Sequence, residues 1–115
     1  MIHLFMAEDA PELLIRDKKP SDIAFLHRTF YDSRKKHRRK LRFSYPELCA
    51  DSKRRMNEWL ADPDVRVHVA TPADDDDLIA GVCVTRNGVV LWAYTRLSLR
   101  GFGVEQALEN AARAR

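Results

Sequence analysis

The fold is decided by the stretch Tyr94-Thr95-Arg96-Leu97-Ser98-Leu99-Arg100-Gly101-Phe102-Gly103-Val104-Glu105. An apolar segment, residues 89–93, precedes it, and a helical pattern over residues 107–111 follows. Glycines between a strand and a helix let a ligand approach the backbone closely, and the helix N-terminus adds positive potential. The stretch therefore predicts a turn that presents backbone N–H groups to a phosphate. The alternative is a purely structural turn, in which Gly101 and Gly103 only connect the strand to the helix.

The composition indicates one ordinary globular domain. The chain has 115 residues, of which 45% are hydrophobic and 32% charged, as is typical of such domains. There is no apolar run long enough to span a membrane, and the segment at residues 1–6 is too short for a signal peptide. Cys49 and Cys83 lie far apart in the sequence, which favours small core side chains in a reducing compartment over a disulfide or a metal site.

Apolar spacing predicts two helices in the first half of the chain. Residues 13–16 are expected to form a short strand, and Pro20 suits the first position of a helix that runs to about Ser33. His27 lies beside the apolar stripe of this helix and is expected to pack its ring at the boundary of the core. A second helix is expected over residues 46–61, with Cys49 on its apolar face.

From residue 65 on, the spacing of apolar residues changes from the period of a helix to that of a strand. Residues 65–70 alternate between apolar and polar, which predicts a half-buried strand with His68 on the exposed face. Two more strands, residues 78–85 and Val89–Thr95, are connected by Asn87-Gly88, the dipeptide typical of a type I′ hairpin turn. The strand over residues 78–85 is apolar on both faces and is expected to be central in the sheet. Gly81 within it indicates close packing or a close backbone approach.

This order of elements predicts an α+β layered domain. We expect a mixed or antiparallel sheet of about four strands, with three helices packed against it. The domain is expected to cover residues 13–115, and residues 1–12 to form an N-terminal arm or strand.

Charge is unevenly distributed although the formal net charge is only +3. Residues 34–42 hold seven cationic side chains: Arg34, Lys35, Lys36, Arg38, Arg39, Lys40 and Arg42. A four-aspartate run at residues 74–77 offsets them. The basic segment predicts a contact with nucleic acid or with an acidic partner. A solvated loop or helix face is the alternative.

The chain resembles the GNAT N-acetyltransferase superfamily over residues 13–115. The last motif resembles its coenzyme A signature, Arg/Gln-x-x-Gly-x-Gly/Ala, with Arg100 first, Gly103 fourth and Glu105 last. Residues 13–16 and 20–23 resemble its opening strand and helix, and residues 67–70 and 78–82 its second and third strands. The two helices with an intervening basic run also resemble a group of GNAT-like proteins encoded by bacteriophages.

The resemblance implies acetyl-coenzyme A as cofactor and a set of site residues. The backbone of Thr95 and Leu97 would pair with the pantetheine arm, and the amide near Thr95 would donate to the acetyl carbonyl. N–H groups of the next six residues would cradle the pyrophosphate: Arg100, Gly101, Phe102, Gly103, Val104 and Glu105. Catalysis would then be mostly the positioning of an amine beside a thioester, and no side chain is singled out as the general base.

The chain departs from the family pattern in two places. Glu105 replaces the small residue at the last motif position and puts a carboxylate beside an anionic ligand. The chain ends at Arg115, where the family continues with a fifth strand, a fourth helix and a hairpin. The C-terminal strands of the full fold are therefore expected to be absent. Val89–Thr95 would then be an open sheet edge to which another chain or a second copy could bind. The apolar segment from Ile2 to Met6 is also expected to contact another chain.

Two functions follow from these features. The first is a GNAT-like N-acetyltransferase domain that is impaired or inactive as a lone chain. The second is a non-catalytic structural or interaction protein derived from the same fold, as in a bacteriophage particle, that contacts other chains through its edge strand and basic segment. The expected location is the cytoplasm of a bacterial host or the virion.

Overall fold

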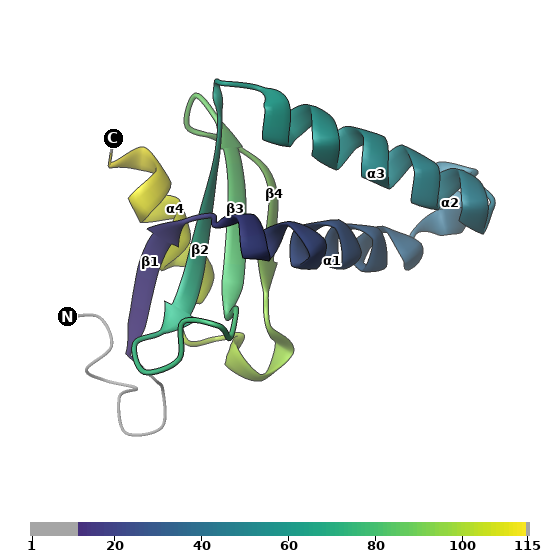
Figure 1. Ribbon diagram of the computed structural model, residues 1–115. Helices are drawn as coiled ribbons and strands as arrows, with labels where there is room; N and C mark the ends of the chain where they lie inside the picture. Colours follow the sequence, from purple (N-terminus) through teal and green to yellow (C-terminus); the bar gives the residue numbers. More distant parts are fainter. Residues whose placement is uncertain (1–11, 115) are drawn as a thin grey trace. The chain divides into compact units, whose positions relative to one another are not determined.

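The computed structural model describes residues 12–114, which divide into two compact units (Figure 1). One unit comprises residues 12–18 and 64–114, and the other comprises residues 19–63. The predicted apolar arm at residues 2–6 lies outside the described residues. No helix in the described part of the chain is both long enough and apolar enough to cross a bilayer.

The first unit is built on a four-stranded antiparallel sheet whose strands follow one another in chain order. Its strands are β1 Leu13–Asp17, β2 Val65–Pro72, β3 Gly81–Arg86 and β4 Val89–Thr95. Each strand therefore pairs with its neighbours in sequence, and β1 and β4 are the two edges within the described residues. The expected α+β class, the sheet of about four strands and the interior position of β3 are confirmed.

The β3–β4 hairpin has the turn that its sequence predicts. Asn87 and Gly88 both have positive φ, 51° and 84°, as a type I′ turn requires. Further along, Val84 pairs with Trp92 but Thr85 pairs with Val90. This irregularity leaves Leu91 as an extra residue in β4, the arrangement of a β-bulge.

The strand β3 begins at Gly81, three residues later than the predicted Leu78. A turn occupies the earlier positions, since the Leu78 N–H donates to the Asp75 carbonyl at 3.3 Å. Leu78 is 37% exposed as a result. The prediction that the strand begins at Leu78 is therefore wrong: the apolar residues 78–80 were assigned to the strand but lie before it.

A single helix, α4 Val104–Arg113, covers one face of the sheet (Figure 1). Ala70 of β2 and Cys83 of β3 form a buried cluster with Val104 and Leu108 of the helix. His68 is directly opposite Cys83 in the β2–β3 register, and it is only 6% exposed. The expectation that His68 is exposed, and β2 half-buried, is therefore wrong: residues 67–72 are buried on both faces of the strand.

The second unit is a helical hairpin. Its elements are a 3-10 turn η2 Pro20–Asp22 and the helices α1 Ile23–Lys35, α2 Arg38–Leu41 and α3 Tyr45–Ala61. The two long helices pack on each other, with the rings of Phe30 and Trp59 5.1 Å apart. Both were predicted, whereas α2 is an additional short turn within the basic segment. Cys49 is exposed, so the expectation that it is a core residue is wrong.

The long helix α3 starts where its capping residues place it. The Ser44 hydroxyl accepts from the Glu47 N–H at 3.2 Å, and the Glu47 carboxylate accepts from the Ser44 N–H at 2.8 Å. This reciprocal pair is a capping box. It satisfies two backbone donors at the helix start and fixes the end of the connection that carries the basic residues.

Candidate functional site

The turn between β4 and α4 has the backbone geometry that the sequence predicts. A short 3-10 helix, η3 Leu97–Leu99, follows β4. Gly101 and Gly103 then have φ of 90° and 84°, values that favour glycine over any other residue. These two glycines turn the chain so that α4 begins at Val104.

The start of α4 has backbone donors without acceptors in the described part of the chain. Gly103 is the N-cap residue and no side chain caps the helix. The first hydrogen bond of the helix runs from the Ala107 N–H to the Gly103 carbonyl, at 3.0 Å. The N–H groups of Val104, Glu105 and Gln106 have no partner among residues 12–114. Free N–H groups and the helix dipole together favour an anion at this point.

Two of the predicted site residues are brought together by a side-chain contact. The Arg100 guanidinium donates from Nε to the Thr95 carbonyl at 3.2 Å. Its side chain is therefore folded back along the turn toward the end of β4. The Arg100 N–H itself donates to the Leu97 carbonyl at 3.3 Å, and the Phe102 N–H to the Leu99 carbonyl at 3.3 Å. Of the six predicted cradle residues, Gly101, Gly103, Val104 and Glu105 have N–H groups without an acceptor among residues 12–114.

Two residues that support this turn were not predicted as site residues. Arg96 anchors the end of β4: its N–H donates to the Ala80 carbonyl at 2.8 Å and its Nε to the Ile79 carbonyl at 3.1 Å. Gly81 allows the close approach of α4, because a Cβ there would lie 2.8 Å from Val104 Cγ1 and 2.9 Å from the Tyr94 carbonyl oxygen. The sequence signal for Gly81 was its place inside a strand; Arg96 gave no signal.

The charge of Glu105, near the start of α4, has two opposite effects. Glu105 is exposed in the first turn of α4, where a carboxylate interacts favourably with the helix dipole. The same charge repels an anion bound at the free N–H groups, by about 1–4 kcal/mol at about 4 Å. Glu109, one turn later, forms an ion pair with Arg113 at 3.5 Å.

Cys83 does not behave as an activated nucleophile. Burial raises the pKa of the Cys83 thiol to about 11, and the negative charges of Glu109 and Glu105 act in the same direction. The thiol of Cys83 is therefore protonated at neutral pH. Groups of three or more potential metal ligands do not occur among residues 12–114.

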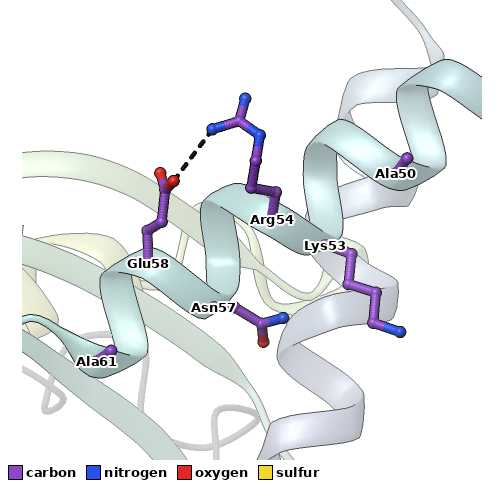
Figure 2. A pocket seen from close by; sticks show the side chains of 6 residues that line it. All are labelled: Ala50, Lys53, Arg54, Asn57, Glu58 and Ala61. Atoms are coloured by element: carbon purple, nitrogen blue, oxygen red, sulfur yellow. Dashed lines mark hydrogen bonds and ion pairs between the residues drawn. The ribbon is translucent and has the colours of Figure 1, made fainter.

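Two surface hollows lie within the described residues of the second unit, and neither of them is enclosed. Figure 2 shows one of them, lined entirely by side chains of α3: Ala50, Lys53, Arg54, Asn57, Glu58 and Ala61. The other is a groove between α1 and α3, lined by His27, Arg28, Tyr31, Cys49, Ser52 and Lys53. His27 is half-buried at its margin, as expected for a boundary residue.

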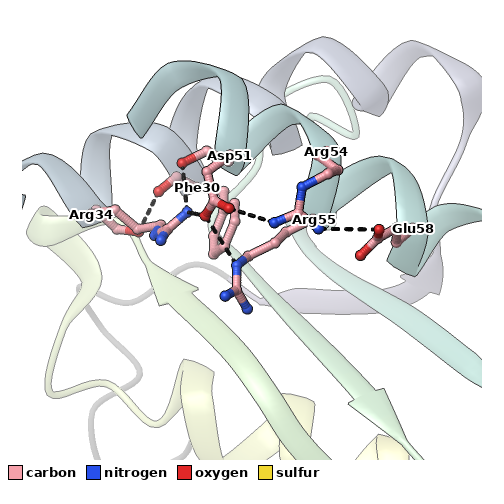
Figure 3. A network of polar contacts seen from close by, with 8 residues as sticks. Phe30, Arg34, Asp51, Arg54, Arg55 and Glu58 are labelled. Carbon is pink, nitrogen blue, oxygen red and sulfur yellow. Dashed lines mark hydrogen bonds and ion pairs between the residues drawn. The ribbon is translucent and has the colours of Figure 1, made fainter. Parts of the chain in front are cut away.

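A polar network joins α1 to α3 in the same unit (Figure 3). The Asp51 carboxylate accepts from Arg34 at 2.8 Å, from Arg55 at 3.1 Å and from Arg54. Arg34 also donates to the Ser52 hydroxyl at 2.9 Å. Burial would raise the pKa of Asp51, but the hydrogen bonds from the three arginines outweigh it and lower the pKa to about 2. The network therefore keeps Asp51 ionised down to strongly acidic pH.

Comparison with known proteins identifies the fold but no sequence relative. No family model matches the chain, and no curated protein matches it in sequence. A solved structure described as a possible acetyltransferase from Clostridium difficile 630 superposes with a TM-score of 0.59. It shares 18% sequence identity, over 86% of this chain and 67% of the other. The fold is GNAT-like.

An acetyltransferase of the GNAT family from Streptococcus pneumoniae also matches, at a TM-score of 0.47 and 18% identity, over 88% of this chain and 64% of the other. The chain thus spans about two thirds of the length of both solved structures. In the GNAT-like fold of this chain the turn at residues 100–103 connects a strand to a helix, as the resemblance implied. The fold expectation is confirmed; the roles of the site residues stay predictions.

Proposed function

We propose that this chain is a GNAT-like N-acetyltransferase domain that uses acetyl-coenzyme A. The observation that carries the proposal is the start of α4, which follows two glycines of positive φ and has no side-chain cap. The N–H groups of Val104, Glu105 and Gln106 there have no acceptor among residues 12–114. A pyrophosphate carries the charge and the acceptor oxygens that such donors favour. The GNAT-like fold supports the same cofactor.

The residues of the turn fit this cofactor in their donors and in their backbone freedom. N–H groups of Gly101 and Gly103 to Glu105 would hold the pyrophosphate, and Arg100 would lie beside it. The backbone of Thr95 and Leu97 would pair with the pantetheine arm, for which Leu97 is accessible at 74% exposure. When bound, acetyl-coenzyme A supplies an acetyl thioester, the acyl donor for an amine. This chain's own contribution is to orient that donor and to stabilise negative charge through backbone N–H groups.

Glu105 is expected to weaken binding rather than to abolish it. Its side chain is exposed and has room to turn toward solvent, but its charge stays close to the free N–H groups. We therefore propose that the activity of the isolated chain is impaired. The acetyl acceptor would be an amine.

Isothermal titration with coenzyme A tests the proposal directly. We expect binding with a dissociation constant below about 1 mM. Glu105→Gln removes the repulsion and should tighten binding about fivefold or more, since about 1 kcal/mol is at stake. Glu109→Gln removes the same charge one turn further along α4 and serves as the matched control. Absence of heat with the parent and with Glu105→Gln would exclude cofactor binding.

A second candidate function is a non-catalytic interaction protein, such as a component of a bacteriophage particle. Its supporting observation is β4, which pairs only with β3 among the described residues and whose Val89 and Val90 are 64% and 39% exposed. An open edge with apolar side chains favours strand addition by another chain or a second copy. The resemblance to GNAT-like proteins encoded by bacteriophages supports a role in the particle.

Sedimentation of the purified chain tests the second candidate. Val90→Lys puts a charge on the open edge and should convert an associated species into a monomer. Leu14→Lys is the control, because Leu14 is 50% exposed on β1 at the opposite edge of the sheet. A parent chain that stays monomeric at all concentrations would exclude self-association. An equal effect of both variants would show that association does not depend specifically on the β4 edge.

A further inference from the structure

The connection between α1 and α3 carries four cations that nothing in the described part of the chain neutralises. They are Lys36, Arg39, Lys40 and Arg42, referred to below as the basic tip. All four are exposed, and their side chains have no hydrogen bond or ion pair among residues 12–114. Their charges are therefore available to a partner.

The other three cations of the basic segment have internal roles. Arg34 has only 14% of its side chain exposed and is paired with Asp51 at 2.8 Å. Lys35 is paired with Asp32 at 3.3 Å. Arg38 donates to the Phe43 carbonyl at 3.1 Å and lies over the Tyr45 ring. The side chains of these three residues thus make contacts within the unit, whereas those of the basic tip make no ion pair or hydrogen bond among residues 12–114.

The immediate surroundings of the basic tip increase its positive potential. No acidic residue occurs between Asp32 and Glu47 in the sequence. Asp32 is paired with Lys35, and the Glu47 carboxylate is engaged by the Ser44 N–H in the capping box. Cations gathered without counter-charges destabilise one another. A bound polyanion would relieve that repulsion.

An exposed aromatic ring follows the basic tip in the sequence, three residues after Arg42. Tyr45 is 54% exposed at the start of α3, and the Arg38 guanidinium lies 4.2 Å from its ring centroid. This contact holds the ring in place by a cation–π interaction. A held aromatic ring next to a basic surface is the combination with which proteins bind single-stranded nucleic acid, through stacked bases and neutralised phosphates.

We propose that the basic tip and Tyr45 bind single-stranded nucleic acid without sequence preference. The four cations contact phosphates, and a base stacks on Tyr45. An acidic peptide fits these observations less well, because it gives no role to the exposed ring. The cations also lie on and beside the four-residue helix α2, where a regularly charged phosphate chain can contact several of them at once.

Fluorescence anisotropy with labelled oligouridylate and oligothymidylate tests this proposal on the full chain. Neutralisation of four phosphates on a single strand predicts a slope of log affinity against log salt of about −3, or roughly 50-fold weaker binding between about 50 and 200 mM salt. Arg39→Gln with Lys40→Gln should halve the slope. Tyr45→Leu should weaken binding about fivefold or more and leave the slope unchanged.

The matched control is Arg28→Gln with Lys53→Gln, which removes two exposed cations of the same unit from the groove between α1 and α3. It should change the affinity less than twofold, and circular dichroism should show that all variants are folded. No binding to either oligonucleotide at low salt would overturn the proposal. So would equal losses in the two double variants, unchanged affinity in Tyr45→Leu, or tighter binding of an oligoglutamate.

Discussion

Gly81 is the residue on which the packing of α4 against the sheet depends. A Cβ at this position would lie 2.8 Å from Val104 Cγ1, 2.9 Å from the Tyr94 carbonyl oxygen and 3.1 Å from Leu108 Cδ1. Because one of these neighbours is backbone, β4 as well as the helix would have to shift. We expect Gly81→Ala to lower the free energy of unfolding by about 1–3 kcal/mol, as overpacking does, in urea denaturation.

Gly88 provides the matched control for this substitution. Its φ is 84°, but a Cβ there has no neighbour within 4 Å. Gly88→Ala therefore adds backbone strain of about 1 kcal/mol without steric conflict. The two variants should also differ in coenzyme A binding. Gly81→Ala should weaken the binding of coenzyme A, since it displaces the start of α4, whereas Gly88→Ala should leave the affinity unchanged. A Gly81→Ala chain as stable as the parent would contradict the packing argument.

Glu105 is expected to act with opposite signs on stability and on binding. Its carboxylate lies in the first turn of α4 and stabilises the helix by about 0.3–1 kcal/mol through the dipole. Glu105→Gln should therefore lower the thermal unfolding temperature slightly while it tightens coenzyme A. Thermal unfolding with and without the ligand measures both. If stability and affinity changed in the same direction, the carboxylate would not be facing the anion site.

At the residue scale, the sequence predicts backbone-controlled positions better than burial. Gly101 and Gly103 were identifiable because a glycine between a strand and a helix has a local conformational reason. The burial of His68 and the exposure of Cys49 were both mispredicted. Burial depends on which elements cover a face, and alternation along one strand does not contain that information.

At the scale of elements, Asp51 couples α1 to α3 and makes their association depend on pH. Its pKa in the folded protein is about 2, below the ordinary value of 3.8. The stabilisation is therefore complete above about pH 5 and is lost as the pH falls through 4 toward 2. Arg54 and Arg55 are about half exposed, at 56% and 51%, so solvent screening limits the effect to about 1 kcal/mol.

Acid unfolding of the parent and of Asp51→Asn measures this coupling. The variant loses the charge that Asp51 contributes to its hydrogen bonds with the three arginines and should be about 1 kcal/mol less stable at neutral pH. The stability difference from the parent should shrink as the pH falls from 4 to 2, since the parent then protonates Asp51. Glu58→Gln, whose carboxylate is 62% exposed, should change stability by less than about 0.5 kcal/mol at any pH.

Element boundaries show where sequence patterns stop being informative. The long helix α3 was predicted to within one residue because its apolar residues recur at helical spacing. The capping box of Ser44 and Glu47, which fixes its first residue in the structure, was not used in that prediction. The short helix α2 was not predicted, because three of its four residues are cationic and the fourth is apolar, so no periodic apolar face can be recognised. Arg and Lys favour helix locally, and Arg42 ends the turn with a φ of 60°.

At the scale of the whole molecule, the sheet order leaves β4 as an edge within residues 12–114. The order β2-β3-β4 follows from a meander of adjacent hairpins, so the sequence was sufficient to predict it. The pairing of β1 with β2 was not predicted, because residues 18–64 separate the two strands. What occupies the outer side of β4 was not predictable, because it depends on a partner that the pattern along one strand does not specify. The same edge lies next to the turn at residues 100–103, so a strand added there would adjoin the proposed cofactor site.

Association through β4 would make thermal stability depend on protein concentration, and this gives the prediction for the whole molecule. A second copy that binds only the folded chain adds up to about 1.4 kcal/mol per dimer, or about 0.7 kcal/mol per chain, for each tenfold rise in concentration. This corresponds to roughly 3–5 °C in the unfolding temperature. Val90→Lys should flatten this dependence, whereas Leu14→Lys should retain it. Differential scanning calorimetry over a hundredfold range of concentration provides the measurement. A parent chain with a constant unfolding temperature would show that β4 does not recruit a second copy, and that strand addition there requires a different chain.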